Sequence, residues 1–297
     1  MSTSPSGYRS IATVAQLAPI DIRTFFTQPT SDQNISPIDE FIGRTDKLNK
    51  LYVPFTTNSA GWMPELGSLI LLGYMSAIES YVRAVVTGLV NVDTVSRRQA
   101  GSKSITFAVA TNHPNPRLLP EVLMENMTFS SEGNIEKALR DILGLHNISA
   151  DLKSTIREFE KLCQVRHCCV HRFGKLGSQN AWALGFDHHR EMIERPFVPT
   201  PADVDRIADA LQITVKTLNN FIFREVLDRT AQFEFDQAAP WCWQWHYGRD
   251  RRKFQSYYDL FALTAVEPRS PGARLVYDSF RLEHFEKIKA RRKQRRR

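Results

Sequence analysis

The sequence has few cysteines, and the four that it has do not form the spaced framework of a disulfide-stabilised protein. Cys163, Cys168 and Cys169 are crowded together, and the fourth is Cys242. Small secreted domains instead spread an even set of cysteines along a short chain and pair them. We therefore expect reduced thiols and a cytoplasmic protein.

The chain also lacks the apolar segments that export or membrane insertion require. Its Ser-rich start runs into Arg9 without the compact apolar core of a signal peptide. The most apolar stretch, residues 66–90, is interrupted by polar and charged side chains: Ser76, Glu79, Ser80 and Arg83. Charges at that density are costly inside a bilayer, so the stretch is typical of a buried helix and no membrane partner is expected.

Positive charge is concentrated in one place. The formal net charge is +7, yet residues 287–297 hold eight Lys and Arg and no acid, which leaves 7 − 8 = −1 for the remainder. No glycine-rich phosphate loop and no internal repeat is present. The body of the protein is therefore nearly neutral, and its basic character belongs to the C-terminal tail.

Length and composition predict one main domain with appendages. A chain of 297 residues with 42% hydrophobic and 24% charged residues can bury a substantial core. Shifts in composition divide the chain into three parts. We expect an N-terminal arm with a docking helix at residues 1–60, a helical domain at 61–230, and a Trp-rich segment with a basic tail at 231–297.

Two helices are predicted in the first part of the chain. Ser36 and Pro37 suit the cap and first position of a helix, which is expected to bury Phe41, Ile42, Leu48, Leu51 and Tyr52. Residues 64–92 carry an apolar stripe wide enough for a central helix, with Leu66, Leu69, Ile70, Ile78, Val82, Val85 and Leu89 among its members.

Three further helices are expected at residues 134–145, 150–170 and 200–228, each with apolar positions at helical spacing. Ser149 suits the cap of the second of these, and Asp151 lies near its positive end. Residues 93–130 and 174–200 lack the helical spacing of apolar residues and are predicted to be mostly irregular. Long helices joined by polar connections indicate an all-α bundle.

The segment most suggestive of chemistry is Arg166 to His171, at the end of the helix predicted for residues 150–170. A guanidinium is always charged and grips phosphate oxygens, whereas an imidazole titrates near neutral pH and can move a ribose proton. Five residues along a continuous helix correspond to about 140° of rotation. If the helix ends near Val170, as Gly174 and Gly177 suggest, His171 can swing towards Arg166.

Residues 166–174, with the sequence RHCCVHRFG, resemble the Rx4-6H motif of the HEPN domain family. His167 occupies the polar second position of that motif. Residues 76–83, with the sequence SAIESYVR, resemble the first core helix of such domains and its acidic position, here Glu79. The resemblance covers residues 64–229 and implies a HEPN-like helical bundle, here with an N-terminal extension and a basic C-terminal extension.

The resemblance further implies a homodimer in which two motifs face one cleft and cleave RNA without a metal or other cofactor. His171 would handle the proton of the ribose 2′-hydroxyl or of the leaving 5′-oxygen, and Arg166 would stabilise the phosphate in the transition state. His167 would orient its neighbours or touch the substrate, and Glu79 would hold Arg166 or His171. Relatives act in antiviral defence or with an antitoxin, which suggests such a partner protein.

Basic side chains near the motif and in the tail are predicted to bind nucleic acid. Beside the motif these are Arg172 and Lys175, and in the tail they are Arg291, Arg292, Lys293, Arg295, Arg296 and Arg297. A tail without interleaved aromatic residues would bind phosphates without reading sequence. A disordered solubilising tail is the alternative.

Other interpretations remain open from the sequence. A catalytically silent helical module that binds RNA or a protein is the main alternative to the nuclease. Cys163, His167 and His171 fall at a spacing that suits structural zinc, but no fourth ligand is evident. The Asp187-His188-His189 triplet of some phosphoesterases is expected to be an ordinary polar loop, and Trp241, Trp243 and Trp245 suggest a short strand, a packed lid or a base-stacking platform.

Overall fold

The structure is a computed structural model that describes residues 11–12, 17–27, 35–112, 115, 117, 119–232 and 243–295, without the side chains of residues 232, 287, 288 and 290–295. The chain divides into two compact units, Met1–Asn34 and Ile35–Arg297. The second unit contains helices from all three segments into which composition divides the chain, so it crosses the expected boundaries after residues 60 and 230.

In the first unit the described residues form one short 3-10 helix, η2 (Ile22–Phe25). The side chain of Asp21 caps this helix by accepting a hydrogen bond from the backbone N–H of Arg23, and it forms an ion pair with the Arg23 guanidinium. This unit contains much of the predicted N-terminal arm; residues 1–10, 13–16 and 28–34 lie outside the described part of the chain.

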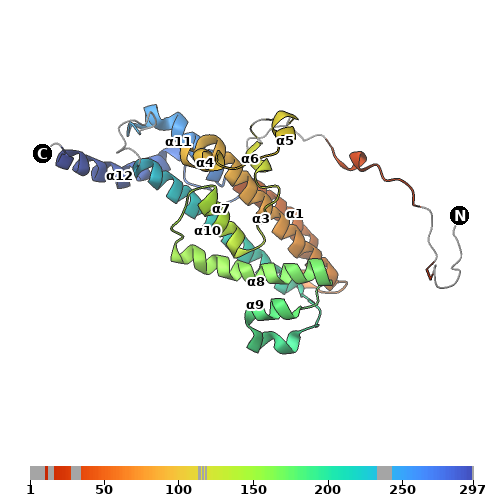
Figure 1. Ribbon diagram of the computed structural model, residues 1–297. Helices are drawn as coiled ribbons and strands as arrows, with labels where there is room; N and C mark the ends of the chain where they lie inside the picture. The colour runs from red at the N-terminus through yellow and green to blue at the C-terminus, as the bar shows by residue number, and fades with distance from the viewer. Residues whose placement is uncertain are drawn as a thin grey trace. The chain divides into compact units, whose positions relative to one another are not determined.

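The second unit is an all-α bundle, as predicted (Figure 1). Its long helices are α1 (Pro37–Tyr52), α3 (Pro64–Val92), α8 (Ala150–Arg172) and α10 (Pro201–Gln232). Helix α3 contacts α1, α8 and α10 as well as α11 (Tyr247–Phe261). It is the central helix that its wide apolar stripe predicts, and it buries fourteen of its own residues.

The predicted starts of these helices are confirmed, because local capping determines them. The Ser36 side chain accepts a hydrogen bond from the Asp39 N–H and caps α1, and the Ser149 side chain caps α8 through the Leu152 N–H. Proline occupies the first position of α1, α3 and α10, where a missing N–H costs nothing.

Two regions expected to be irregular contain helices. Residues 93–130 include α4 (Thr94–Ala100), α5 (Phe107–Asn112) and α6 (Leu119–Val122), and residues 174–200 include α9 (Ser178–His189) followed by η4 (Arg190–Met192). The prediction that residues 174–200 are irregular was wrong for α9, because this helix buries a polar residue and exposes an aromatic one. Asn180 and Ala181 are buried, whereas Trp182 is 73% exposed. Apolar side chains therefore do not mark its inner face.

Helix boundaries and burial differ from expectation in three further places. Helix α7 (Glu132–Asp141) ends four residues earlier than predicted, although Ile142 and Leu143 remain buried beyond its end. Leu51 and Leu69, both expected in the core, are 48% and 63% exposed. An apolar residue is buried only where a neighbouring element covers it, and sequence pattern does not specify how much of a helix is covered.

Helix α3 is the one helix among the described residues that is long and apolar enough to cross a membrane. More than half of its most apolar window, 56%, is buried inside the protein. The core helix of a soluble bundle meets the same length and composition test, so this feature does not indicate a membrane span.

The tryptophans of the C-terminal segment belong to the core. Trp243 and Trp245 are 2% and 4% exposed, and both rings lie 5.4 Å from the ring of Phe280 on α12 (Ala273–Arg295). The Trp243 indole N–H donates to the Thr230 hydroxyl at 2.9 Å. A buried ring offers no face to a nucleobase, so the stacking-platform interpretation is wrong for these two residues; no strand is described here, and Trp241 lies outside the described residues.

A buried carboxylate joins the start of α1 to the segment after α11. Asp39 accepts hydrogen bonds from the Thr264 N–H at 2.8 Å, the Thr264 hydroxyl at 2.6 Å and the Ala265 N–H at 2.9 Å. Burial alone would raise the pKa of the Asp39 carboxyl, but these donors outweigh it and the pKa lies below its ordinary value. The charged form is therefore the one that stabilises the fold.

The stabilisation from Asp39 is expected to be lost in acid. Because its folded pKa is depressed, its contribution is fully present above the unfolded pKa of about 3.9 and falls as the pH drops below that value. We expect the difference in unfolding free energy between wild type and Asp39→Asn to be constant above about pH 5 and to shrink below about pH 4. Urea titrations at several pH values measure this difference.

The matched control is Asp46→Asn, in the same helix. Asp46 is an exposed residue whose carboxylate pairs with Lys50 at 2.7 Å, and exposed pairs contribute little to stability. Its effect on the unfolding free energy is expected to be small throughout the pH range. An Asp39→Asn difference that stayed constant down to pH 3 would contradict the role of the charged Asp39.

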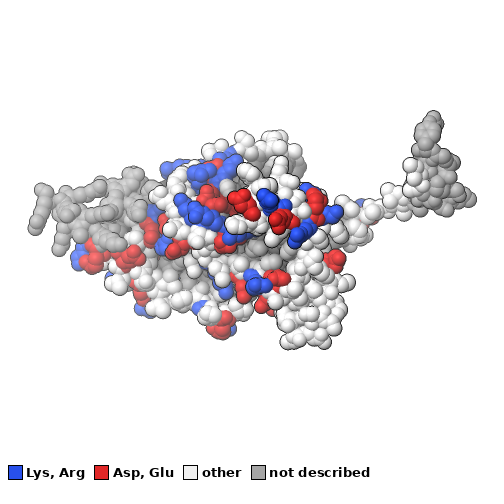
Figure 2. Space-filling model, turned by 90° about the horizontal axis from the view of Figure 1, so that it is seen from below, with Lys and Arg blue, Asp and Glu red and all other residues white. Residues whose placement is uncertain are grey.

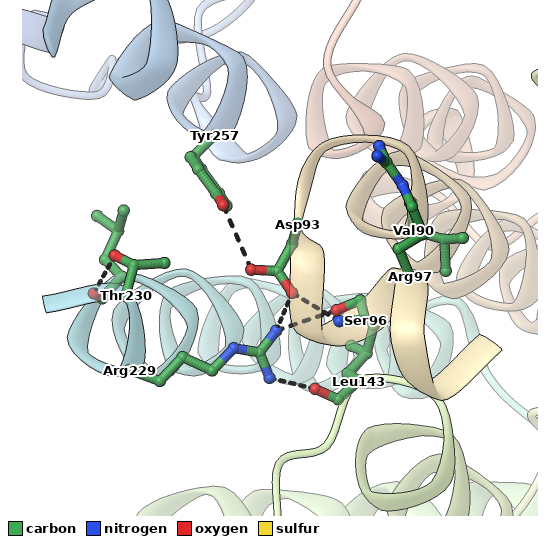
Figure 3. A network of polar contacts seen from close by, with 9 residues as sticks. Val90, Asp93, Ser96, Arg97, Leu143, Arg229, Thr230 and Tyr257 are labelled. Carbon is green, nitrogen blue, oxygen red and sulfur yellow. Dashed lines mark hydrogen bonds and ion pairs between the residues drawn. The ribbon is translucent and has the colours of Figure 1, made fainter. Parts of the chain in front are cut away.

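A second buried cluster joins four helical segments (Figure 3). Arg229 on α10 forms an ion pair with Asp93, donates to the Ser96 hydroxyl at 3.0 Å and donates to the Leu143 carbonyl beyond α7. Asp93 also accepts from the Ser96 N–H at 2.7 Å, which caps α4, and from the Tyr257 hydroxyl at 3.3 Å. The Asp93 and Arg229 side chains are only 2% and 12% exposed, so this ion pair is shielded from water.

Candidate active site at the end of helix α8

Helix α8 continues two residues beyond its predicted end and then stops with a left-handed cap. Phe173 adopts a φ of 53° and Gly174 a φ of 86°, and the Gly174 N–H donates to the Cys168 carbonyl at 3.1 Å. This hydrogen bond satisfies one of the backbone carbonyls that have no partner within the last turn of a helix. His171 therefore lies within the last turn of regular helix, and the expected swing towards Arg166 does not occur.

The regular helix separates the two residues of the motif within one chain. Arg166 and His171 are offset by about 140° around the axis. Arg166 is half-buried and His171 is exposed. The side chain that the helix does bring to His171 is His167, four residues earlier: their ring centroids lie 4.4 Å apart, with an angle of 49° between the planes. Both imidazoles are exposed.

Arg166 lies in a region where charge surrounds a buried thiol. Burial raises the pKa of the Cys163 thiol, the Glu160 and Glu79 carboxylates raise it further, and the Arg166 guanidinium lowers it. Arg166 on α8 and Glu79 on α3 thus lie near the same sulfur. Among the described residues, however, Glu79 makes no hydrogen bond or ion pair with Arg166 or His171, so the expected holding contact is not formed within this chain.

The crowded cysteines are reduced and mostly buried. Cys163 and Cys168 are 3% and 2% exposed, and burial also raises the pKa of the half-buried Cys169 thiol, against the opposing effect of a hydrogen bond with Ser68. No group of three or more His, Cys, Asp or Glu side chains in the described parts of the chain is arranged to hold a metal ion. The described residues thus offer no support for the zinc interpretation, and Cys163 faces the core while His171 faces outwards.

The basic residues that follow the motif have different environments. Arg172 forms an ion pair with Glu194, and these side chains are 37% and 58% exposed. Lys175 is exposed, and its backbone bridges to Pro196, beside hydrogen bonds from Leu176 N–H to Arg195 O at 3.1 Å and from Glu194 N–H to Leu176 O at 2.9 Å. This short pairing anchors the segment after α9 to the end of α8.

Exposed apolar side chains lie at the end of α8 and on the neighbouring helix α9, a feature that sequence reasoning missed. Phe173 is 88% exposed and Val170 is 45% exposed at the end of α8. On α9, which contacts α8, Trp182 is exposed and its ring lies 5.4 Å from that of Phe186. The signal in the sequence was the pair of aromatic residues Trp182 and Phe186, which lie four positions apart in a segment predicted to be a loop. The end of α8 therefore carries exposed apolar side chains next to the motif in sequence, and α9 carries an exposed aromatic pair.

The Asp187-His188-His189 triplet ends α9 and does not form the expected loop. His189 Nδ1 lies 2.9 Å from the Gly185 carbonyl of the preceding turn, and Gly185 itself has a φ of 102° that kinks the helix. Phosphoesterases with this triplet place it with acidic motifs at strand ends, and the described residues form helices with one isolated bridge.

The charged surface is mixed in sign. On the face shown in Figure 2, Lys and Arg side chains lie beside Asp and Glu side chains and form no continuous positive area. The basic tail enters α12, which extends to Arg295. The side chains of Arg291, Arg292, Lys293 and Arg295 and the whole of Arg296 and Arg297 lie outside the described residues, so their predicted contacts with nucleic acid stay predictions.

Comparison with known proteins adds no family assignment: no protein-family profile, curated protein or solved structure matches the chain with significant similarity. The resemblance to HEPN domains therefore depends on the motif and its helical setting alone.

Proposed function

We propose that this protein is a metal-independent endoribonuclease of HEPN type that acts as a cytoplasmic homodimer in antiviral defence or growth arrest. The observation that carries the proposal is the pair of exposed histidines, His167 and His171, at the capped end of a core helix, with Arg166 on another side of the same helix end. Among the described residues the half-buried Arg166 side chain makes no hydrogen bond or ion pair, so its guanidinium donors are not already occupied within the chain.

The chemistry assigns a separate task to each side chain. An imidazole such as that of His171 moves a proton at the ribose 2′-oxygen or the leaving 5′-oxygen. The Arg166 guanidinium stabilises the extra negative charge on the phosphate in the transition state. The products are a 2′,3′-cyclic phosphate and a 5′-hydroxyl, and no water or metal enters this step.

A second copy of the chain completes the proposed site. Because Arg166 and His171 point to different sides of one α8, Arg166 of one chain and His171 of the other are expected to meet across the dimer. A two-fold dimer presents the same surface from both chains, and the exposed side chains of Val170, Phe173 and Trp182 provide apolar area for such a contact. An antitoxin or defence partner would regulate access to the cleft.

The proposal is tested by incubating the purified protein with RNA in EDTA and identifying the product ends. We expect cleavage to persist with chelator and to leave 2′,3′-cyclic phosphates, because no step requires a metal. Treatment with a phosphatase before and after acid distinguishes cyclic from open phosphate ends. Cleavage abolished by EDTA, or products with 3′-hydroxyl ends, would contradict the proposal.

A catalytically silent module that binds RNA or a protein is the second candidate. The exposed apolar side chains at the end of α8 and on α9 favour it, since exposed apolar area of this kind is typical of interaction sites. It predicts binding of RNA or of a partner without cleavage, and no change in cell growth when His171 is replaced.

A further inference from the structure

The feature that the proposed function leaves unused is the contact between the two imidazoles. His167 and His171 lie on the same side of α8, one turn apart, with ring centroids separated by 4.4 Å. Both are exposed, so their contact is not part of the core. Two histidines in this arrangement are neighbouring side chains that can each carry a proton.

Cleavage of RNA by its own 2′-hydroxyl requires two proton transfers. A base accepts the proton of the 2′-hydroxyl while the 2′-oxygen bonds to phosphorus, and an acid donates a proton to the 5′-oxygen as its bond to phosphorus breaks. A guanidinium cannot act in either role because it does not lose its proton in proteins. In the shared site proposed above, Arg166 of one chain and His171 of the other therefore supply a single proton carrier, and a second is needed at that site.

We infer that His167 is that second carrier, and that His167 and His171 of one chain divide the two transfers as a general acid–base pair. This inference depends on the proposed ribonuclease function. In each cleavage the neutral ring gains the 2′-hydroxyl proton and the cationic ring gives one to the 5′-oxygen. The proton count is balanced, and exchange with water or between the neighbouring rings restores the starting state.

The surroundings of the two rings are compatible with this role. The charged residues adjacent to the pair in the sequence are Arg166, which precedes His167, and Arg172, which follows His171 and is paired with Glu194. No carboxylate of the described residues forms a hydrogen bond or ion pair with either imidazole, so neither is committed to a partner within the chain. Arg166 remains the group that binds phosphate.

The test uses two RNA oligonucleotides that differ at one atom, the bridging 5′-oxygen or a sulfur in its place. A thiol has an ordinary pKa of about 8.5, far below that of an alcohol, so a sulfur leaving group departs without a general acid. Wild type, His167→Ala and His171→Ala are compared on both substrates. His188→Ala, an exposed histidine on α9, is the matched control.

We expect each of the two variants to cleave the oxygen substrate about 10²–10⁴-fold more slowly than wild type. One of them is expected to recover to within about tenfold of wild type on the sulfur substrate, which identifies the general acid, whereas the other remains slow. His188→Ala should match wild type on both. Because His167 and His171 are exposed, the variants should keep the wild-type melting temperature.

Two results would overturn the inference while leaving the ribonuclease in place: wild-type cleavage of the oxygen substrate by His167→Ala, or equal losses on both substrates for both variants. If wild type cleaved neither oligonucleotide nor a longer structured RNA, the proposed function itself would fail and the inference with it.

Discussion

Replacing Arg229 by alanine is expected to lower the free energy of unfolding by about 3–5 kcal/mol, because it leaves a buried carboxylate without its counter-charge. Asp93 is 2% exposed and would keep its hydrogen bonds from Ser96 and Tyr257 while losing its counter-charge. The same change frees the Leu143 carbonyl, which Arg229 holds beyond the end of α7. Urea denaturation measured by far-UV circular dichroism provides the free energy.

The matched control is Arg224→Ala, an arginine of the same helix. The Arg224 side chain is 58% exposed and pairs with its neighbour Glu225 at 3.1 Å. Replacing Arg224 should lower the free energy of unfolding by less than about 1 kcal/mol, because exposed ion pairs are screened by water. If Arg229→Ala and Arg224→Ala were equally stable, the buried cluster would not be holding the four helical segments together.

The Asp93→Asn variant distinguishes the contribution of the ion pair to stability from the contribution of the helix cap. An amide oxygen can still accept from the Ser96 N–H that begins α4, so the cap is retained while the charge is lost. This variant is also expected to be destabilised, since Arg229 is then the buried charge without a partner. Burial lowers the pKa of Arg229, and the Asp93 carboxylate offsets part of that effect. The double variant, Arg229→Ala with Asp93→Asn, should lose less unfolding free energy than the sum of the losses in the two single variants.

His171→Ala and Arg166→Ala are each expected to reduce RNA cleavage by about 10²–10⁴-fold without unfolding the protein. His171 carries a proton at the reacting oxygens, and Arg166 stabilises charge on the phosphate. His171 is exposed and Arg166 is half-buried in the last turns of α8, so neither fills the core. Initial rates on a labelled RNA in EDTA, with melting temperatures measured in parallel, test the pair.

Mixing the two inactive variants tests whether the site is shared between chains. If Arg166 of one chain serves His171 of the other, a heterodimer of the variants contains one intact site and one that lacks both residues. Equal mixing after subunit exchange should then restore about a quarter of the wild-type activity. A mixture as inactive as its components would show that both residues act within one chain.

The sequence alone was enough to predict the main helices and, to within two residues, the end of α8. Ser36 with Pro37, Ser149 and Pro201 start helices through contacts made within one turn, and such contacts do not depend on the rest of the fold. The i, i+4 spacing of His167 and His171 likewise implies neighbouring rings once the helix is known. These features are local, which is why residue pattern determines them.

Long-range packing decided the rest. Arg229 and Asp93 are 136 positions apart and have no shared pattern, so only the approach of α10 to the end of α3 makes them partners. The same is true of Trp243 and Trp245, which a surface role would have left exposed, and of α9, where Asn180 is buried and Trp182 is not. Burial depends on which surfaces other elements cover, and that is a property of the whole chain and not of any segment.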